Sequence, residues 1–126
     1  MSITTGLHHI AILCSEREAS LRFYETLGFV VYESHVRPER KDEVIFMNGP
    51  GIVLELFISE KHPQRVSNPE AYGLRHLALR TENAEAIHMI LLEAGYNPEP
   101  IRIDTFNDRK LFFVKDPDGL PIELHE

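Results

Sequence analysis

The chain has 126 residues, which suits one ordinary domain, and either half alone is too short to bury a good core. Hydrophobic residues make up 43% and charged residues 26%, as in globular proteins, and no apolar run approaches the length of a membrane span. The formal net charge is −7 without a basic stripe, which argues against nucleic acid or a membrane as a partner. The single cysteine, Cys14, excludes an internal disulfide, and with no signal-peptide pattern in view we expect a cytoplasmic protein.

The first half predicts the order β-α-β-β-β. Its expected elements are a strand over 7–14, a helix over 16–27 and strands over 29–36, 43–48 and 51–58. Ser15 and Glu18 form a capping box for the helix, and Gly28 ends it. The sequence Asn48-Gly49-Pro50-Gly51 predicts the turn between the last two strands. This first module covers about 5–59.

A linker over 60–72 leads to a second module, about 73–126, with the same plan. Its expected elements are a strand over 74–80, a helix over 82–94, a weak or edge strand over 98–104 and strands over 109–115 and 119–125. Thr81 is the expected helix cap, and Gly95 ends the helix. The sequence Asp116-Pro117-Asp118-Gly119 predicts the last turn.

The two modules repeat each other. The stretch Leu74-Arg75-His76-Leu77-Ala78-Leu79 matches Leu7-His8-His9-Ile10-Ala11-Ile12 at an offset of 76 − 9 = 67 residues. The same offset places Gly95 on Gly28, and one extra residue places Glu123 on Glu55. A long offset seen only twice indicates the duplication of one supersecondary unit. Because a histidine and a glutamate are both repeated, the duplication extends to candidate functional residues as well as to packing residues.

The alternation of side chains along a strand places the repeated histidines and glutamates on the sheet face that the helices do not cover. Side chains alternate along a strand, so His9, Glu55, His76 and Glu123 lie opposite the aliphatic residues that pack under the helices. If the halves pair about a pseudo-two-fold axis, two imidazoles and two carboxylates converge, which is a typical first-row metal site. Burying two carboxylates without a cation would cost roughly several kcal/mol each. Taken singly, each residue also fits an ordinary structural histidine or an edge charge.

His8 is the alternative to His9 as a ligand. Its parity groups it with Ile10 and Ile12 on the helix-packed side, and the repeat aligns His9 with His76. We therefore prefer His9. The remaining histidines are expected at the surface, namely His35, His62, His88 and His125.

The sequence resembles the vicinal oxygen chelate superfamily, and within it the glyoxalase I-like proteins of the small bacterial YaeR-type subgroup. The motifs that carry the resemblance are LHHIAIL, FYETLGF, IVLELF, YGLRHLAL and DPDGLPIELHE, and together they span almost the whole chain. The resemblance implies an α+β fold in which two βαβββ modules in tandem, forming one domain over 1–126, make a half-open β-barrel around one metal ion.

The resemblance also implies an activity. Glyoxalase I-like enzymes convert the thiohemiacetal of a 2-oxoaldehyde into a thioester through a metal-stabilised enediolate. Carried over by position, the metal ligands are His9, Glu55, His76 and Glu123, with Glu123 as the catalytic base and Glu55 as the second choice. The implied cofactor is one divalent ion, nickel or zinc, with cobalt, manganese or iron as alternatives. For a substrate carboxylate the basic candidates are Arg37, Arg109 and Lys110, each of which equally fits a solvated surface charge.

Two other classes of function stay open. One is a metal-dependent thiol transferase or dioxygenase on the same scaffold, and the other is a non-enzymatic protein that binds a small molecule, as resistance proteins do. Thiol transferases and dioxygenases of this kind lack a carboxylate where Glu55 stands, and the related epimerases usually carry glutamine there, so Glu55 favours the glyoxalase I type. We also expect a homodimer in which the two chains share each site; the alternative is that one chain closes a site by itself.

Overall fold

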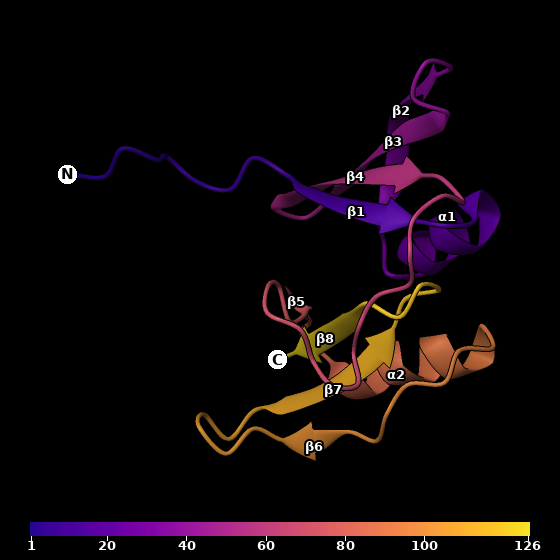
Figure 1. The fold of residues 1–126 in the computed structure, drawn as a ribbon. Helices are drawn as coiled ribbons and strands as arrows, with labels where there is room; N and C mark the ends of the chain where they lie inside the picture. The colour runs from indigo at the N-terminus through magenta and orange to yellow at the C-terminus, as the bar shows by residue number, and fades with distance from the viewer. The chain divides into compact units, whose positions relative to one another are not determined.

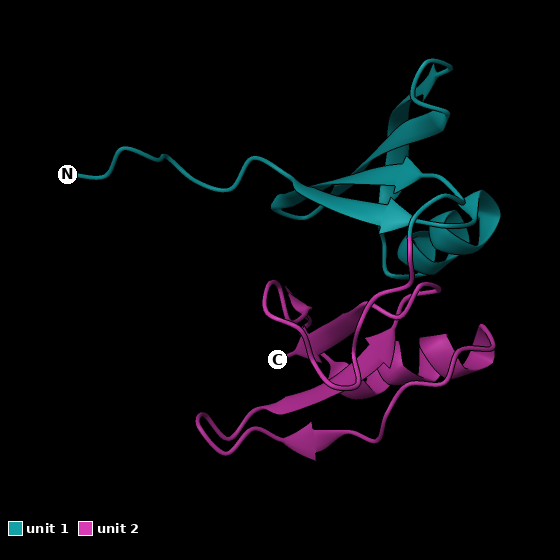
Figure 2. Cartoon of the chain, in the orientation of Figure 1, with its two compact units in different colours: residues 1–62 teal, residues 63–126 magenta.

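The computed structural model describes residues 1–126 and divides into two compact units, Met1–His62 and Pro63–Glu126 (Figure 2). The division falls within the linker that the sequence predicts. Neither helix is long and apolar enough to cross a membrane.

Each unit contains one βαβββ module (Figure 1). The elements of the first are β1 (Ile10–Cys14), α1 (Arg17–Thr26), β2 (Val30–Arg37), β3 (Asp42–Gly49) and β4 (Ile52–Ile58). Those of the second are β5 (Leu77–Arg80), α2 (Ala84–Glu93), β6 (Arg102–Ile103), β7 (Lys110–Lys115) and β8 (Pro121–His125). The strand orders are β1-β4-β3-β2 and β5-β8-β7-β6, so the two sheets have one topology. The prediction of two tandem βαβββ modules is confirmed.

Each unit has its own core beneath one face of its sheet. In the first unit Phe23 and Tyr24 of α1 are fully buried, together with strand residues on the helix-packed face of the sheet, including Ile45, Leu54 and Leu56. In the second unit the fully buried residues include Leu91 of α2, Phe112 and Ile122. Helical spacing and strand alternation therefore place the apolar residues on facing surfaces.

The helix starts differ from the predicted ones. Glu16, rather than Ser15, caps α1, and its carboxylate accepts the backbone N–H groups of Glu18 and Ala19. Asn83, rather than Thr81, caps α2, where its side-chain oxygen accepts the N–H of Ala86. A carboxylate and an amide oxygen both serve well at this position, so the prediction was wrong by one or two residues.

The first strand of each module starts later than predicted. β1 begins at Ile10 and β5 at Leu77, so His9 and His76 each stand immediately before a strand. β6 has only two residues and lies at the edge of its sheet, in agreement with the donors that Pro98 and Pro100 remove.

Candidate metal centre

One histidine–glutamate pair lies in the first unit. β1 runs parallel to β4 with Ala11 opposite Glu55, and His9 precedes Ala11 by two residues on the same face. The Nε2 atom of His9 lies 3.1 Å from Oε2 of Glu55. The Glu55 side chain keeps 15% of its surface exposed, whereas Leu54 and Leu56, which point to the opposite face of β4, are fully buried.

The second unit contains the same pair. β5 runs parallel to β8 with Ala78 opposite Glu123, which repeats the register of Ala11 and Glu55. The Nε2 atom of His76 lies 3.1 Å from Oε1 of Glu123. Glu123 lies between buried Ile122 and Leu124, and 13% of its side-chain surface is exposed. The structure therefore joins His9 to Glu55 and His76 to Glu123.

A phenylalanine lies across the sheet from each glutamate. Phe46 of β3 is opposite Glu55, and Phe113 of β7 is opposite Glu123. The ring of Phe113 meets the imidazole of His76 edge to face, with the ring centroids 5.0 Å apart. This contact restricts rotation of the imidazole whose Nε2 faces Glu123.

The side chain of the residue before each of the two histidines lies near Nδ1, the ring nitrogen that does not face the glutamate. Nδ1 of His8 lies 2.9 Å from Nδ1 of His9, whereas Nη1 of Arg75 lies 3.5 Å from Nδ1 of His76. The first distance is that of a good hydrogen bond and the second is at the outer limit. His8 is exposed rather than packed under the helix, because the strand has not yet begun at this residue, so that part of the parity argument was wrong.

Among the basic candidates for substrate binding, two are neutralised by carboxylates. Arg37 donates to both oxygens of Asp42 at 2.8 and 2.7 Å, and its guanidinium lies over the ring of Phe57. The Arg37 guanidinium lowers the pKa of the Asp42 carboxyl below its ordinary value. Lys110 is ion-paired with Glu85, whereas the guanidinium of Arg109 makes no ion pair.

The expectation of a surface position holds for His35 and His62, which are exposed, but was wrong for His125. His125 donates Nε2–H to Oδ2 of Asp104 at 2.8 Å and Nδ1–H to the carbonyl of Glu126 at 2.6 Å. An imidazole donates from both nitrogens only when protonated, and the hydrogen bond to Asp104 is the main reason that the pKa of His125 is raised. The same bond lowers the pKa of Asp104. His88 is half-buried, with Nε2 at 3.0 Å from the carbonyl of Glu99.

Strand alternation in the sequence also predicts two further residues, Arg80 and His125, on the face of Glu123. His125 has the parity of Glu123, and Arg80 has the parity of His76 and Ala78, so the alternation rule predicts all of them on one face. Arg80 lies opposite His125 in the parallel register. Asn107 had no comparable signal, because it lies in the irregular turn before β7.

The sequence-family model of the Glyoxalase/Bleomycin resistance protein/Dioxygenase superfamily matches residues 6–124 of the chain. The chain belongs to this superfamily. Uncharacterized protein YaeR of Escherichia coli is 40% identical to it over 124 residues, with 95% of each chain covered. Glyoxylase I 4 of Arabidopsis thaliana is 30% identical over 128 residues, covering 95% of this chain and 70% of the relative. The resemblance to the YaeR-type subgroup is thus confirmed.

Solved structures of this superfamily have the same fold as the chain. A glyoxalase family protein from Enterococcus faecalis superposes with a TM-score of 0.93 at 44% identity, covering 99% of this chain and 100% of that one. The fosfomycin resistance protein FosX from Listeria monocytogenes, solved with Mn(II) and sulfate, superposes with a TM-score of 0.75 at 16% identity, covering 98% and 93%. At that identity the likeness concerns the superfamily fold alone.

The donor atoms of this superfamily member suit a metal ion. Two ligand atoms about 2.1 Å from one ion and at right angles to each other lie roughly 3 Å apart. The Nε2–O separation of 3.1 Å in each pair agrees with that value. Each unit brings together one histidine and one glutamate, and no group of three or more histidine, cysteine, aspartate or glutamate side chains that could hold a metal is found in the structure.

Proposed function

We propose that His9, Glu55, His76 and Glu123 bind one divalent metal ion and that the protein is a glyoxalase I-like lyase or isomerase. The observation that carries this proposal is the pair of equivalent histidine–glutamate contacts, each with an N–O distance of 3.1 Å and each at the same parallel register. A shared ion would offset the cost of holding two largely buried carboxylates near each other.

The fourth donor supports the glyoxalase I type of reaction. Glu55 supplies a carboxylate where the thiol transferases and dioxygenases that the sequence resembles have none. The 30% identity to Glyoxylase I 4 adds support from a relative with that name. A donor set of two imidazoles and two carboxylates suits nickel or zinc, and manganese is the ion present with FosX.

A divalent ion held by these residues would polarise the one remaining carbonyl of a bound thiohemiacetal and favour ionisation of its neighbouring hydroxyl group. Glu123, half-buried beside His76, would take the proton from the carbon that carries sulfur and return it to the neighbouring carbon. The hydroxyl proton then moves to the other oxygen, so that thiohemiacetal and thioester contain the same atoms. Glu55 is the alternative base, because its burial and its contact with His9 match those of Glu123.

The substrate in this proposal is a small carbonyl compound, with a thiol adduct as its reactive form.

We further propose that the protein is a homodimer whose chains share each site. The second candidate function is a metal-dependent thiol transferase or dioxygenase on the same superfamily fold.

The deciding experiment is turnover of methylglyoxal by the metal-loaded protein with a panel of thiols. We expect thioester formation, and Glu123→Gln should lower kcat by roughly 100-fold or more, as loss of a positioned base does. Glu55→Gln should act mainly on metal affinity. The absence of isomerisation with every thiol and every metal would contradict the proposal, while thiol addition to an epoxide such as fosfomycin would support the second candidate.

A further inference from the structure

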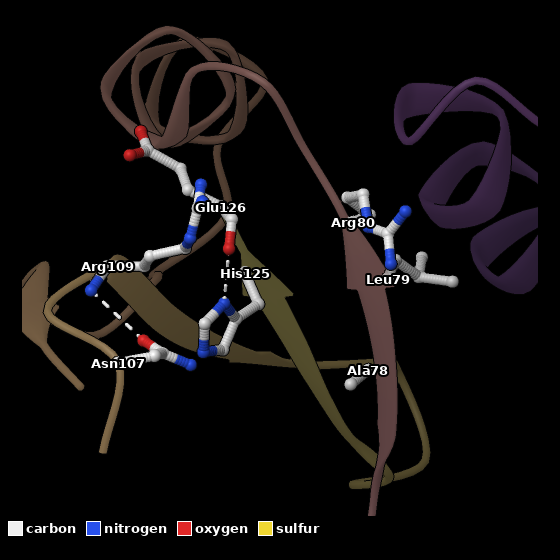
Figure 3. A pocket seen from close by; sticks show the side chains of 7 residues that line it. All are labelled: Ala78, Leu79, Arg80, Asn107, Arg109, His125 and Glu126. Atoms are coloured by element: carbon white, nitrogen blue, oxygen red, sulfur yellow. Dashed lines mark hydrogen bonds between the residues drawn. The ribbon is translucent and has the colours of Figure 1, made fainter. Parts of the chain in front are cut away.

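The backbone segment just before β5 determines where one candidate metal ligand stands. His76 precedes the strand, so the ladder between β5 and β8 begins at Leu77 and does not include the histidine. Two residues after His76, on the same face, Ala78 lines a cavity of about 590 Å³ in the second unit (Figure 3). A shift of the backbone before β5 would therefore displace both a candidate ligand and a wall of this cavity.

Arg65, in the linker, holds this segment with its side chain. Its Nη2 atom donates to the backbone carbonyl of Leu74 at 2.8 Å and to that of Arg75 at 2.9 Å. All three residues belong to the second unit. A guanidinium nitrogen of this kind has two hydrogens, so it can serve both carbonyls, and a charged donor forms stronger hydrogen bonds than a neutral one. The two bonds tie the linker to the two residues immediately before His76.

Other features of the loop between Arg65 and His76 act less directly on the backbone. Gly73 has a φ of 126°, which side chains other than glycine rarely adopt, so the chain can turn just before the two carbonyls. Nε of Arg75 lies 3.0 Å from Oε1 of Glu70, but both of these side chains are exposed, and an exposed ion pair contributes little. Arg65 is therefore the side chain that we expect to fix this segment.

The segment before the other candidate histidine is held differently. Leu7 and His8, which precede His9, are exposed, and the contact there joins the imidazoles of His8 and His9 rather than the backbone. The side chain of His9 keeps 36% of its surface exposed, against 25% for His76. The ring of His76 also packs against Phe113. Of the two imidazoles, His76 is thus the one that is restrained both at its backbone and at its ring.

We propose that Arg65 is a positioning residue of the metal centre, whose guanidinium fixes the backbone before His76 so that the imidazole faces Glu123 before any ion binds. Nε2 of His76 and Oε1 of Glu123 lie 3.1 Å apart in the structure. Donors that are ordered in advance lose less freedom when an ion binds, which raises its affinity. The role of His76 as a ligand rests on the proposed function, whereas the hold of Arg65 on the backbone is a property of the metal-free protein.

The first test uses the metal-free protein. Arg65→Met keeps much of the apolar stem but has no donor, and Arg65→Lys keeps a charged donor. NMR follows the nuclear Overhauser effects between the ring protons of His76 and Phe113, whose centroids lie 5.0 Å apart. We expect these effects in the native protein and in Arg65→Lys, and their loss in Arg65→Met. Arg65 is exposed and lies outside the helices and strands, so circular dichroism should show an intact fold in both variants.

The second test measures zinc affinity by competition with a chelator, and the visible absorption spectrum of the cobalt-loaded protein. Arg65→Met should bind zinc about tenfold more weakly, which is the lower end of the range for partners outside the ligand set, with an altered cobalt spectrum. Arg65→Lys should restore both properties. Arg22→Met is the matched control, because this exposed arginine lies on α1 and its loss changes the charge equally. Glu70→Gln, in the same loop, should leave the affinity nearly unchanged.

Unchanged ring contacts or an unchanged zinc affinity in Arg65→Met would overturn the inference, as would an equal loss in Arg65→Met and Arg65→Lys. A loss of the same size in Glu70→Gln would also overturn it, because the loop as a whole would then be responsible. Failure of the native protein to bind any divalent ion would contradict the proposed function, and the NMR comparison would still decide whether Arg65 positions His76. Metal binding that depends on Arg65, without turnover of methylglyoxal, would support the inference and contradict the proposed activity.

Discussion

Oε1 of Glu123 and Nε2 of His76 lie 3.1 Å apart, and the same distance separates Oε2 of Glu55 from Nε2 of His9. In both units the glutamate lies opposite an alanine two residues after the histidine. The repeat detected in the sequence is therefore also a repeat of side-chain geometry. The duplication of the strand pair has reproduced the histidine–glutamate contact. Under the proposed function the two contacts together provide the four donors of one metal ion.

The first prediction concerns these four donors. Alanine in place of His9, Glu55, His76 or Glu123 should each lower metal affinity beyond the factor of about 10–100 that loss of an outer partner causes. Metal content after gel filtration and competition with a chelator measure the effect. His35→Ala is the control, because this exposed imidazole also pairs with a glutamate, Glu33, but within one strand, β2. If only one of the two pairs affected metal content, a single four-donor ion would be excluded.

The second prediction concerns His8. For a neutral His9 to present the Nε2 lone pair to a metal, Nδ1 must carry the hydrogen, and Nδ1 of His8 at 2.9 Å can accept it. His8→Ala should therefore lower metal affinity by about 10–100-fold while the fold, followed by circular dichroism, stays unchanged. Arg75→Ala, at the equivalent position, should have a smaller effect, because the guanidinium, 3.5 Å from Nδ1 of His76, can only donate and cannot accept a hydrogen from that nitrogen. Equal effects of the two variants would argue against a role for His8 in orienting the ring.

Much of this arrangement could be predicted from the sequence, because strand alternation and turn residues are local properties. The rule that puts Leu54 and Leu56 in the core also turns Glu55 toward His9. Helix caps were less predictable, since Ser15 and Glu16 are neighbours that can both accept N–H groups and only the backbone path decides between them.

The errors around His125 have a different origin. Strand alternation alone places His125 on the face of Glu123, so the expectation of a surface position conflicts with the rule that places the glutamate. The contact of His125 with Asp104 could not be predicted from the sequence. Asp104 directly follows the two-residue strand β6 and lies 125 − 104 = 21 positions before His125, so the contact depends on the path of an irregular segment. Contacts that depend on irregular backbone have no periodic signal in the sequence.

The third prediction concerns stability in acid. Arg37 holds the pKa of Asp42 below that of an unfolded aspartate, which is about 3.9, so the ion pair stabilises the folded state above that pH. This stabilisation should be lost as the pH falls through the lower folded-state pKa. Asp42→Asn should thus unfold at a lower urea concentration than the native protein at pH 7, and the difference should shrink in strong acid. A difference that is independent of pH would mean that the carboxylate charge does not matter.

The fourth prediction concerns Gly49, at the end of β3. A Cβ atom at this position would overlap the ring of Phe29, which is buried with 3% of its surface exposed. Gly49 has no positive φ, so the backbone would accept alanine and the cost is steric alone. Gly49→Ala should reduce the free energy of unfolding by about 1–3 kcal/mol, as overpacking does, measured by urea denaturation.

The aromatic ring provides the control for that steric explanation. If Phe29 is the obstacle, Gly49→Ala should cost less in a Phe29→Leu background than in the native one, a non-additivity expected for residues in contact. Asn48→Ala, an exposed neighbour on β3, should change stability by no more than about 0.5 kcal/mol. Strict additivity of the Gly49 and Phe29 changes would show that the cost of the alanine does not come from contact with the Phe29 ring.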